Sequence, residues 1–438
     1  MNNEQRTIAF YTLGCKLNFS ETSTLARAFV NSGFKVVPAS HAADVYLINT
    51  CSVTESADKK CRQAIRKFIK QSPSAVIAVT GCYAQLKPKA IAAIEGVDLI
   101  VGADLKGNIV ELVNNVREKG NARIFSCEIN EVDSFFQAFS SGDRTRSFLK
   151  VQDGCDYKCS YCTIPMARGK SRNIPISDIL KEAEQIAASG IKEVVLTGVN
   201  IGDFGKTTGE PFFDLVKALD KVEGIERYRI SSIEPNLLTN ELIKYVAQSA
   251  KFLPHFHIPL QSGSNRILGL MRRRYKREIF ASRLEYIYKL MPNAFIGVDV
   301  IVGFPGETDD DFIDAYQFIE SLSPSFLHIF PYSERPNTPT AHMEGKLNPS
   351  IINERANRFN ELCKQLYSDF YKKNIEKTAN VLFESAQYGK MMHGFTENYV
   401  KVEVPYQKNL CGIVISVKLT EIADSGNMKA KILSKADY

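Results

Sequence analysis

The sequence has no run of apolar residues long enough to cross a lipid bilayer, which takes roughly eighteen. Residues 1–6 also lack the basic stretch, followed by an apolar core, that marks a secretory signal. These two absences lead us to expect a cytoplasmic protein without a membrane partner.

The chain also has a small net charge and few histidines. The 55 basic and 49 acidic residues leave a net charge of only +6, which permits a polyanionic partner without requiring one. The six histidines form no evident Ser–His–Asp arrangement, and no pair of catalytic carboxylates stands out. Such a chain fits an enzyme whose cofactors perform the reaction while protein groups orient them. Its 438 residues suggest about three domains.

Cysteine, in contrast, is plentiful. Because cytosolic thiols stay reduced, the ten cysteines are better explained as ligands or redox groups than as disulfides. Cys155, Cys159 and Cys162 follow the apolar residues 148–151 with the spacing Cys-x3-Cys-x2-Cys. An iron–sulfur cubane takes one cysteine at each iron, so three cysteines leave one iron open to a substrate or cofactor. Structural zinc takes four ligands, and no fourth cysteine or histidine is nearby, which favours a cluster over zinc.

A second set of cysteines follows three strand-like runs in the first 120 residues. Residues 7–13, 45–50 and 75–81 lead to Cys15, Cys51 and Cys82, with helical patterns at 21–32 and 57–71. This alternation predicts a doubly wound parallel sheet, whose strands all end at one edge. The three thiols could hold a second cluster there, although small cysteines also suit tight turns. The other four are isolated, and we interpret them as structural: Cys61, Cys127, Cys363 and Cys411.

The central part of the chain repeats a strand followed by a helix six times. Such units build either an open sheet or a barrel, and counting strands does not choose between them. In both, ligand-binding groups come just past the strand ends. The expected strands cover residues 148–151, 193–196, 227–230, 255–260, 295–302 and 326–330.

The loop that carries Cys155, Cys159 and Cys162, with Tyr161 before the last cysteine, resembles the cluster motif of radical S-adenosylmethionine (SAM) enzymes. With Gly-Cys-Lys-Leu-Asn at 14–18 and Asn-Thr-Cys-Ser-Val-Thr at 49–54, the whole chain resembles the radical SAM methylthiotransferase family. Members of this family insert a sulfur and a methyl group at an unactivated C–H bond.

The resemblance implies two [4Fe-4S] clusters with three cysteine ligands each. Cys155, Cys159 and Cys162 would hold the cluster that cleaves SAM, and Cys15, Cys51 and Cys82 the sulfur-bearing auxiliary cluster. SAM would serve both as methyl donor and as radical source. An electron donor protein is the implied partner for reduction.

The same resemblance suggests SAM-binding residues at the strand ends. Besides Tyr161, they are Gly198 and Asn200 in the loop that holds the SAM amino group, Glu234 for ribose hydroxyls or the ammonium, Gln261, Arg266 for the carboxylate, and Gly303 beside the adenine. For the segment after Gly303, a turn followed by a helix cap at Thr308 and Asp311 explains the residues equally well. The basic residues between 266 and 277 are either a solvated face or, as we favour, an RNA contact.

The resemblance divides the chain into four parts with an overall α/β fold. A doubly wound methylthiotransferase domain covers residues 1–120, and a linker covers 121–144. A partial (βα)6 radical SAM barrel covers 145–374. Short strands in 375–438 are typical of a small β-barrel and resemble the RNA-binding TRAM domain.

One branch of the family fits two further segments. Lys-Leu-Asn at 16–18 and residues 57–66 resemble the threonylcarbamoyl branch, with Cys61 where serine is usual. We therefore expect an enzyme that converts N6-threonylcarbamoyladenosine at position 37 of tRNA to its 2-methylthio derivative. Its partner would be the anticodon stem-loop that carries this nucleoside. The alternatives are N6-isopentenyladenosine as substrate, or a non-catalytic iron–sulfur RNA-binding module.

Overall fold

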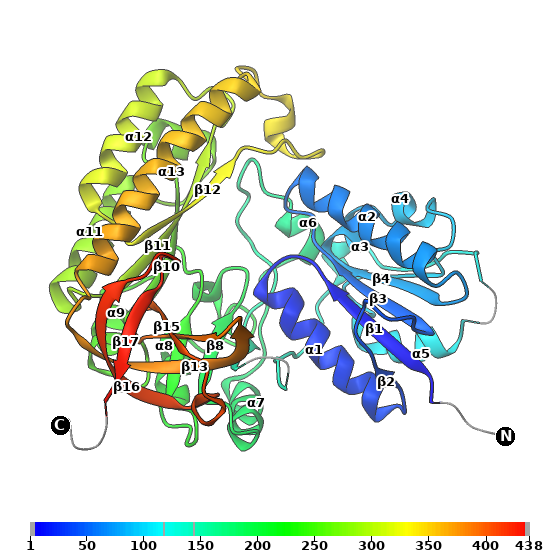
Figure 1. Cartoon of the computed structure of the whole chain (residues 1–438). Coiled ribbons are helices and arrows are strands. Elements are labelled where there is room, and N and C mark those ends of the chain that lie inside the picture. The colour runs from blue at the N-terminus through cyan, green and yellow to red at the C-terminus, as the bar shows by residue number, and fades with distance from the viewer. Residues whose placement is uncertain (1–4, 117–118, 143–144, 434–438) are drawn as a thin grey trace.

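An N-terminal sheet of six parallel strands has the order β2-β1-β3-β4-β5-β6 (Figure 1). The computed structural model describes residues 5–116, 119–142 and 145–433. Strands β3 and β4 are buried along their whole length, as central strands covered on both faces should be. The strands are β1 (Thr7–Thr12), β2 (Lys35–Val36), β3 (Val45–Thr50), β4 (Val76–Gly81), β5 (Leu99–Val101) and β6 (Arg123–Phe125).

Helices cover both faces of this sheet, because each carries an apolar stripe. Leu25 and Phe29 of α1 (Lys16–Asn31) pack with Ile109 of α5 (Ile109–Asn114) on one face. Ile65 and Phe68 of α2 (Glu55–Gln71) pack on the other face, beside α3 (Cys82–Leu86) and α4 (Pro88–Ala92). The predicted α/β class with parallel strands is confirmed. Strand β6 follows residue 120 and still pairs with β5, so the sheet reaches past the predicted limit of the first domain.

The central unit (residues 146–372) contains the six expected strands, all parallel. They form two three-stranded sheets, β7-β8-β9 and β10-β11-β12. Single parallel bridges, Tyr228 with Phe252 and Ser232 with His257, connect the two sheets into one curved array. The strands are β7 (Arg146–Lys150), β8 (Glu193–Thr197), β9 (Arg227–Ile230), β10 (His255–Gln261), β11 (Phe295–Val302) and β12 (Phe326–Pro331).

Alternate residues of these strands point to opposite faces. Phe256, Ile258 and Leu260 of β10 belong to the main apolar core with the covering helices, whereas His257 lies on the other, concave face. The concave face is therefore the one that can hold polar groups. The helices are α6 (Ile164–Arg168), α7 (Ile176–Ala188), α8 (Phe212–Leu219), α9 (Asn240–Gln248), α10 (Asn265–Leu270), α11 (Arg277–Leu290), α12 (Asp309–Leu322) and α13 (Pro349–Lys372).

The C-terminal unit (residues 378–432) is a barrel closed in the order β13-β14-β15-β17-β16. Its interior is filled by apolar side chains such as Phe383, Met392 and Val417. The strands are β13 (Thr378–Tyr388), β14 (Met391–Phe395), β15 (Lys401–Pro405), β16 (Val414–Ile422) and β17 (Met428–Ile432).

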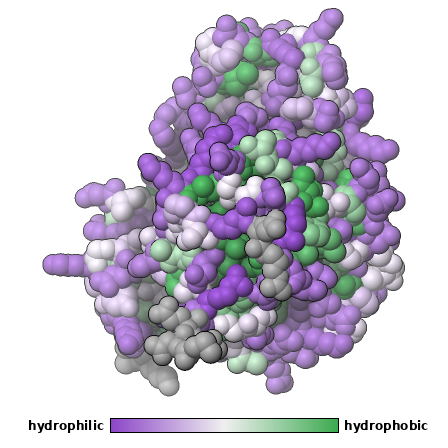
Figure 2. Space-filling view, turned by 90° about the vertical axis from the view of Figure 1, so that its right-hand side faces the viewer, coloured by the Kyte–Doolittle hydropathy of each residue, from purple (hydrophilic) through white to green (hydrophobic). Residues whose placement is uncertain are grey.

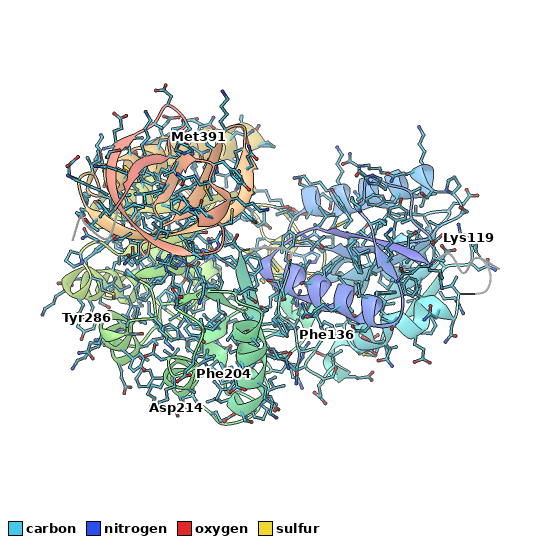
Figure 3. All side chains as sticks on the ribbon, turned by 60° about the horizontal axis from the view of Figure 1, so that its bottom comes forward. Lys119, Phe136, Phe204, Asp214, Tyr286 and Met391 are labelled. Carbon is cyan, nitrogen blue, oxygen red and sulfur yellow. The ribbon has the colours of Figure 1, made fainter. Side chains whose placement is uncertain are left out.

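Buried arginines connect the three units. Arg229 of β9 donates to the carbonyls of Thr396 and Glu397, so the C-terminal barrel is bonded to the central strands. Arg335, which follows β12, donates to Ser52 Oγ and Asp58 Oδ2 of the N-terminal unit at 2.9 and 2.8 Å. Figure 3 shows the resulting arrangement, with Met391 on the C-terminal barrel and Lys119 at the far end of the N-terminal unit.

The outer surface is mainly polar. Figure 2 shows hydrophilic side chains over most of one face, with apolar side chains gathered in a limited area near its middle. Within the described residues, no helix combines the length and the apolar character that a membrane crossing requires.

Candidate functional site

Cys155, Cys159 and Cys162 lie in the loop between β7 and α6. Gly154 opens this loop with φ of 73°, and a Cβ there would lie 1.9 Å from the Lys170 carbonyl oxygen, so only glycine fits. The thiols of Cys155, Cys159 and Cys162 are near enough to influence one another electrostatically. The loop therefore brings the predicted cysteines together.

Hydrogen-bond donors surround these sulfur atoms. The Tyr157 and Ile164 backbone N–H groups point at Cys155 Sγ and Cys162 Sγ, each at 3.4 Å. Burial raises the pKa of Cys155 and Cys162 to about 12, so as free thiols they are neutral. Donors aimed at thiols that are neutral on their own suit thiolates that are charged only when a metal centre holds them.

Cys15, Cys51 and Cys82 follow β1, β3 and β4 at one edge of the N-terminal sheet. Two glycines let the strand ends approach: a Cβ on Gly14 would lie 2.8 Å from Cys51 Cβ, and one on Gly81 would lie 2.4 Å from the Thr50 carbonyl oxygen. The three thiols interact electrostatically, and Cys15 is exposed whereas Cys82 is buried. This placement matches the predicted second cysteine set.

A buried charge network lies between the two cysteine sets. Glu21 of α1 accepts from Lys106 Nζ at 2.6 Å and from Lys150 Nζ at 2.9 Å. Asp153 accepts from Lys150 Nζ at 2.6 Å and from Arg168 Nη1 at 2.9 Å. With Arg172, four cations face two carboxylates. The excess positive charge borders Cys82 and suits an anionic thiolate cluster.

A cavity of about 220 Å³ opens between the central and N-terminal units. Cys162 and Tyr161 line it from the cysteine loop, Gln261 and Asp299 from the central strands, and Val53 from the loop after Cys51. A larger groove of about 860 Å³ lies elsewhere, between α1 and β13, and none of the six candidate cysteines lines it. The smaller cavity is thus the one that adjoins the predicted chemistry.

The loop after β8 presents unpaired polar atoms close to the cysteine loop. Gln152 Oε1 accepts from the backbone N–H groups of Val199 and Asn200, each at 2.9 Å, and its Nε2 donates to the Gly154 carbonyl. Gly198 packs so tightly that a Cβ would lie 2.9 Å from Gln152 Oε1. Both amide atoms of Asn200 are buried without a partner among the described residues, so they suit a polar ligand such as the SAM amino acid group.

The other candidates for SAM binding have different surroundings. Gln261 sits at a bulge with φ of 68°, a conformation rare outside glycine that is common at ligand sites, and lines the cavity. The Gly303 N–H donates to Glu307 Oε2 at 3.0 Å. Arg266 is half exposed and pairs with Asp311, away from the cysteine loop. Glu234 is paired with Arg273, and burial raises its pKa while this arginine opposes the effect.

Arg273 is a residue that sequence reasoning missed. Its guanidinium donates to Cys159 Sγ at 3.1 Å and is almost fully buried. Of the basic run 266–277, for which we favour an RNA contact, Arg274 is exposed and lies over the Tyr157 ring at 4.2 Å, whereas the Arg273 side chain is withdrawn from solvent. The only available signal was that the run follows a strand end; its contact with a cysteine 114 residues away could not be deduced.

Comparison with known proteins agrees with this arrangement. The sequence model of the radical SAM superfamily matches residues 149–319, and that of the uncharacterized protein family UPF0004 matches residues 7–102. The chain is 41% identical over 424 residues to the threonylcarbamoyladenosine tRNA methylthiotransferase MtaB of Bacillus subtilis, covering 94% of this chain and 93% of that protein. The chain belongs to the radical SAM methylthiotransferase family. The predicted membership is confirmed, and with it an enzyme that uses an iron–sulfur cluster and SAM.

Relatives of this methylthiotransferase include a second type of tRNA enzyme. The tRNA-2-methylthio-N(6)-dimethylallyladenosine synthase of Sulfurihydrogenibium is 31% identical to it, over 94% of this chain and 96% of that protein. Among solved structures, the radical SAM methyltransferase TsrM of Kitasatospora setae matches with a TM-score of 0.56 and 14% identity, over 77% of each chain. At this identity the likeness concerns the fold alone.

Proposed function

We propose that this methylthiotransferase converts N6-threonylcarbamoyladenosine at position 37 of tRNA to its 2-methylthio derivative. The observation that carries the proposal is a cavity lined by Cys162 of one three-cysteine site and by the loop after Cys51 of the other, in a chain 41% identical to an MtaB over nearly its whole length. The other relative, named for a dimethylallyl substituent, is 31% identical and makes N6-isopentenyladenosine the alternative substrate.

We infer two [4Fe-4S] clusters. Cys155, Cys159 and Cys162 would hold the first and Cys15, Cys51 and Cys82 the second. When bound, the first supplies the electron that cleaves SAM and the second the sulfur. Residues of this chain orient the reactants: Gln152 ties the cysteine loop to the loop after β8, and Arg273 donates to Cys159 Sγ. Burial raises the pKa of the Cys155 and Cys162 thiols to about 12, and these thiols would lose their protons on binding iron.

SAM would lie between Cys162 and the concave face of the central strands. Asn200 offers two unpaired amide atoms for its amino acid group, and Tyr161 and Gln261 line the cavity. The two predicted glycines, Gly198 and Gly303, are not among the residues that line it. Glu234 would act together with Arg273 rather than as an isolated carboxylate. Arg266 could bind the SAM carboxylate only if its ion pair with Asp311 broke, so it has the least support among the predicted SAM-binding residues.

The domain assignment is part of the same proposal. The curved array β7 to β12 would be the partial (βα)6 barrel of radical SAM enzymes, and residues 375–438 the TRAM domain that holds tRNA. Residues 1–120 together with β6 would form the methylthiotransferase domain, and the residues from there to 144 would join it to the barrel. An electron donor protein, in a cytoplasmic setting, completes the expected partners.

Mass spectrometry of tRNA nucleosides tests this function. A deletion strain should lose the methylthio-threonylcarbamoyl nucleoside and regain it when the wild-type gene is restored. Cys155→Ala should abolish the release of 5′-deoxyadenosine by purified protein, whereas Cys82→Ala should spare this release and stop sulfur insertion. Cys411→Ser, which lies in the C-terminal barrel outside both sets, serves as the control.

Three results would contradict the proposal in different ways. Retention of the nucleoside in the deletion strain would exclude this substrate, and loss of the isopentenyl derivative instead would favour the alternative. A protein that binds iron but never releases 5′-deoxyadenosine with a reductant would be the non-catalytic module. Identical behaviour of Cys155→Ala and Cys82→Ala would refute the division of roles.

A further inference from the structure

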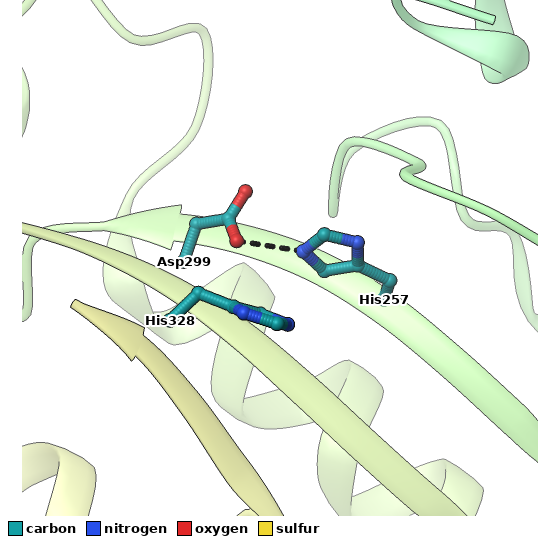
Figure 4. A group of neighbouring side chains, drawn as sticks. All are labelled: His257, Asp299 and His328. Carbon is teal, nitrogen blue, oxygen red and sulfur yellow. Dashed lines mark hydrogen bonds and ion pairs between the residues drawn. The ribbon is translucent and has the colours of Figure 1, made fainter. Parts of the chain in front are cut away.

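Three polar side chains meet on the concave face of the central strands. His257, Asp299 and His328 come from β10, β11 and β12, and their ligand-type atoms all lie within 4.8 Å of one another. Figure 4 shows the three side chains turned toward one point, with His257 Nε2 and Asp299 Oδ1 hydrogen-bonded at 2.6 Å. We call these three residues the polar floor.

The strand register explains why they meet. Asp299 lies directly opposite His328, and His257 lies opposite Gly297. A Cβ at position 297 would be only 3.7 Å from His328 Nε2 and 3.9 Å from His257 Cδ2, so the glycine leaves room between the rings. Phe326 packs edge-on against His328 at 4.9 Å and fixes the ring from below. The site is therefore built on rigid strands.

The polar floor is continuous with the cavity beside the cysteines. Asp299 itself lines that cavity together with Cys162 and Gln261. Ile301 and Phe330, two residues beyond Asp299 and His328 on the same face, line it too. His328 is exposed, so its imidazole is open to a ligand.

A cation of the N-terminal unit acts on the polar floor. Lys16, next to Cys15, is exposed, so a ligand can reach its ammonium group. It acts electrostatically on His328, and the groups that act most strongly on Lys16 itself are not carboxylates: Tyr399, Arg146, Cys15 and Arg229. An ammonium without a carboxylate partner is suited to an anionic group of a ligand.

We propose that the polar floor and Lys16 form the subsite for the N6 substituent of the target adenosine, and that this substituent is polar and carries hydroxyl and carboxylate groups. The inference rests on the proposed function, since it assumes a modified adenosine as substrate. Asp299, oriented by His257, accepts a hydrogen bond from the hydroxyl or a urea N–H. The His328 imidazole donates to an oxygen, and Lys16 pairs with the carboxylate.

This subsite discriminates against apolar substituents. An isopentenyl group would bury the polar floor without offering it hydrogen bonds. Enzyme pockets discriminate most strongly against a substrate that leaves their buried polar groups unpaired in this way. The threonylcarbamoyl group offers partners to all of them. The polar floor therefore favours the first of the two nucleosides after which the relatives are named.

A divalent metal is the competing occupant, because two histidines and one carboxylate can form a metal site. The geometry favours the substrate. Two ligand atoms on one tetrahedral zinc lie about 3.4 Å apart, whereas His257 Nε2 and Asp299 Oδ1 are in direct hydrogen-bond contact at 2.6 Å. A metal would have to break this hydrogen bond.

The test uses reconstituted protein and three RNA hairpins that differ only at the N6 position: threonylcarbamoyl, isopentenyl or unmodified. Wild-type protein should bind the first hairpin most tightly. His328→Phe, which keeps the ring packed on Phe326, and Lys16→Met should each weaken its binding by about ten- to hundredfold, the range for one lost buried hydrogen bond. Their affinity for unmodified RNA should match that of wild type. His41→Ala removes an exposed histidine of the N-terminal unit and is the control.

The outcomes separate this inference from the proposed function. The subsite would be refuted if the variants lost the same affinity for all three hairpins, or no affinity for the threonylcarbamoyl hairpin. It would also be refuted if wild-type protein bound a zinc-class metal that His328→Phe did not bind. Iron content equal to wild type shows that the variants fold. If wild-type protein prefers the threonylcarbamoyl hairpin but never methylthiolates it, the proposed function fails while the subsite stands.

Discussion

Glu182 on α7 shows how a single buried residue controls stability. It is 6% exposed, and one of its carboxylate oxygens has no hydrogen-bond partner in the described structure. Burial raises its pKa to about 7 from an ordinary 4.5. The folded protein therefore keeps a proton that the unfolded chain releases above pH 4.5, and stability falls as the pH rises from there to about 7.

Glu182→Gln should remove this pH-dependent loss. We expect the variant to be more stable than wild type at pH 8 by up to about 3 kcal/mol, and nearly equal to it at pH 5. Thermal unfolding midpoints at the two pH values measure the difference. Glu184→Gln, on the exposed side of the same helix, should change neither midpoint. If Glu182→Gln is no more stable than wild type at pH 8, ionisation of Glu182 does not destabilise the folded protein.

The residues of the candidate site could be predicted from the sequence wherever they form a local pattern. The eight-residue loop of Cys155 and the three strand-end cysteines followed from spacing and from the alternation of strands and helices. The partners of these residues were not predictable, because packing decides them. Arg273 reaches a cysteine 114 positions away, and Arg266, which could equally have faced the cavity, pairs with Asp311.

At the scale of elements, the junction between β4 and α3 depends on one glycine. Gly81 has φ of 97°, and a Cβ there would lie 2.4 Å from the Thr50 carbonyl oxygen and 2.5 Å from Asn49 Oδ1. Gly81→Ala should therefore push α3, which begins at Cys82, away from β3. We expect the variant to lose about half of its bound iron and to unfold at a lower temperature, which iron analysis and thermal melting measure.

Gly190 separates the two causes of this effect. It also has a positive φ, of 82°, but no atom lies within 4 Å of its ideal Cβ. Gly190→Ala should cost only about 1 kcal/mol, from backbone strain alone, and leave the iron content unchanged. Equal iron loss in both variants would show that crowding at Gly81 is irrelevant to the cysteine site.

Long strands were predictable and very short ones were not. The six central strands carry four to eight residues of clear apolar pattern, and the structure contains all six. Strands β5 and β6 have three residues each, too few for a periodic signal, and β6 is mostly exposed. The sheet exists at β6 because its backbone pairs with β5, which sequence pattern alone does not encode.

At the scale of the whole molecule, the position of the units could not be read from the sequence. The cavity needs Val53 of the N-terminal unit and Asp299 of the central unit at the same place. The contacts that fix this placement are buried ion pairs between distant residues, such as Arg335 with Asp58 and Lys150 with Glu21. Charged residues that look ordinary in the sequence thus hold the two units together beside the cavity.

Glu21 is the member of these contacts whose loss should matter most. Burial alone would raise its pKa, but Lys106, Lys150 and Arg168 outweigh burial and hold the pKa below its ordinary 4.5. Because the folded-state pKa is lowered, this stabilisation is complete above the unfolded pKa and is lost as the pH falls below it. Glu21→Gln leaves buried cations with too little opposite charge and should cost about 3–5 kcal/mol at pH 7.

Thermal unfolding between pH 7 and pH 2 measures this contribution. The midpoint of Glu21→Gln should lie well below that of wild type down to about pH 4.5, and the gap should narrow only below this pH, because Glu21 in the unfolded wild-type chain then takes up a proton that the folded protein does not. Glu55→Gln is the matched control, since Glu55 pairs with Arg335 across the same boundary but is 59% exposed. It should change stability by under about 1 kcal/mol. A gap that does not narrow below pH 4.5 would mean that Glu21 acts through shape rather than charge, and that the contact between the units does not depend on the buried ion pairs.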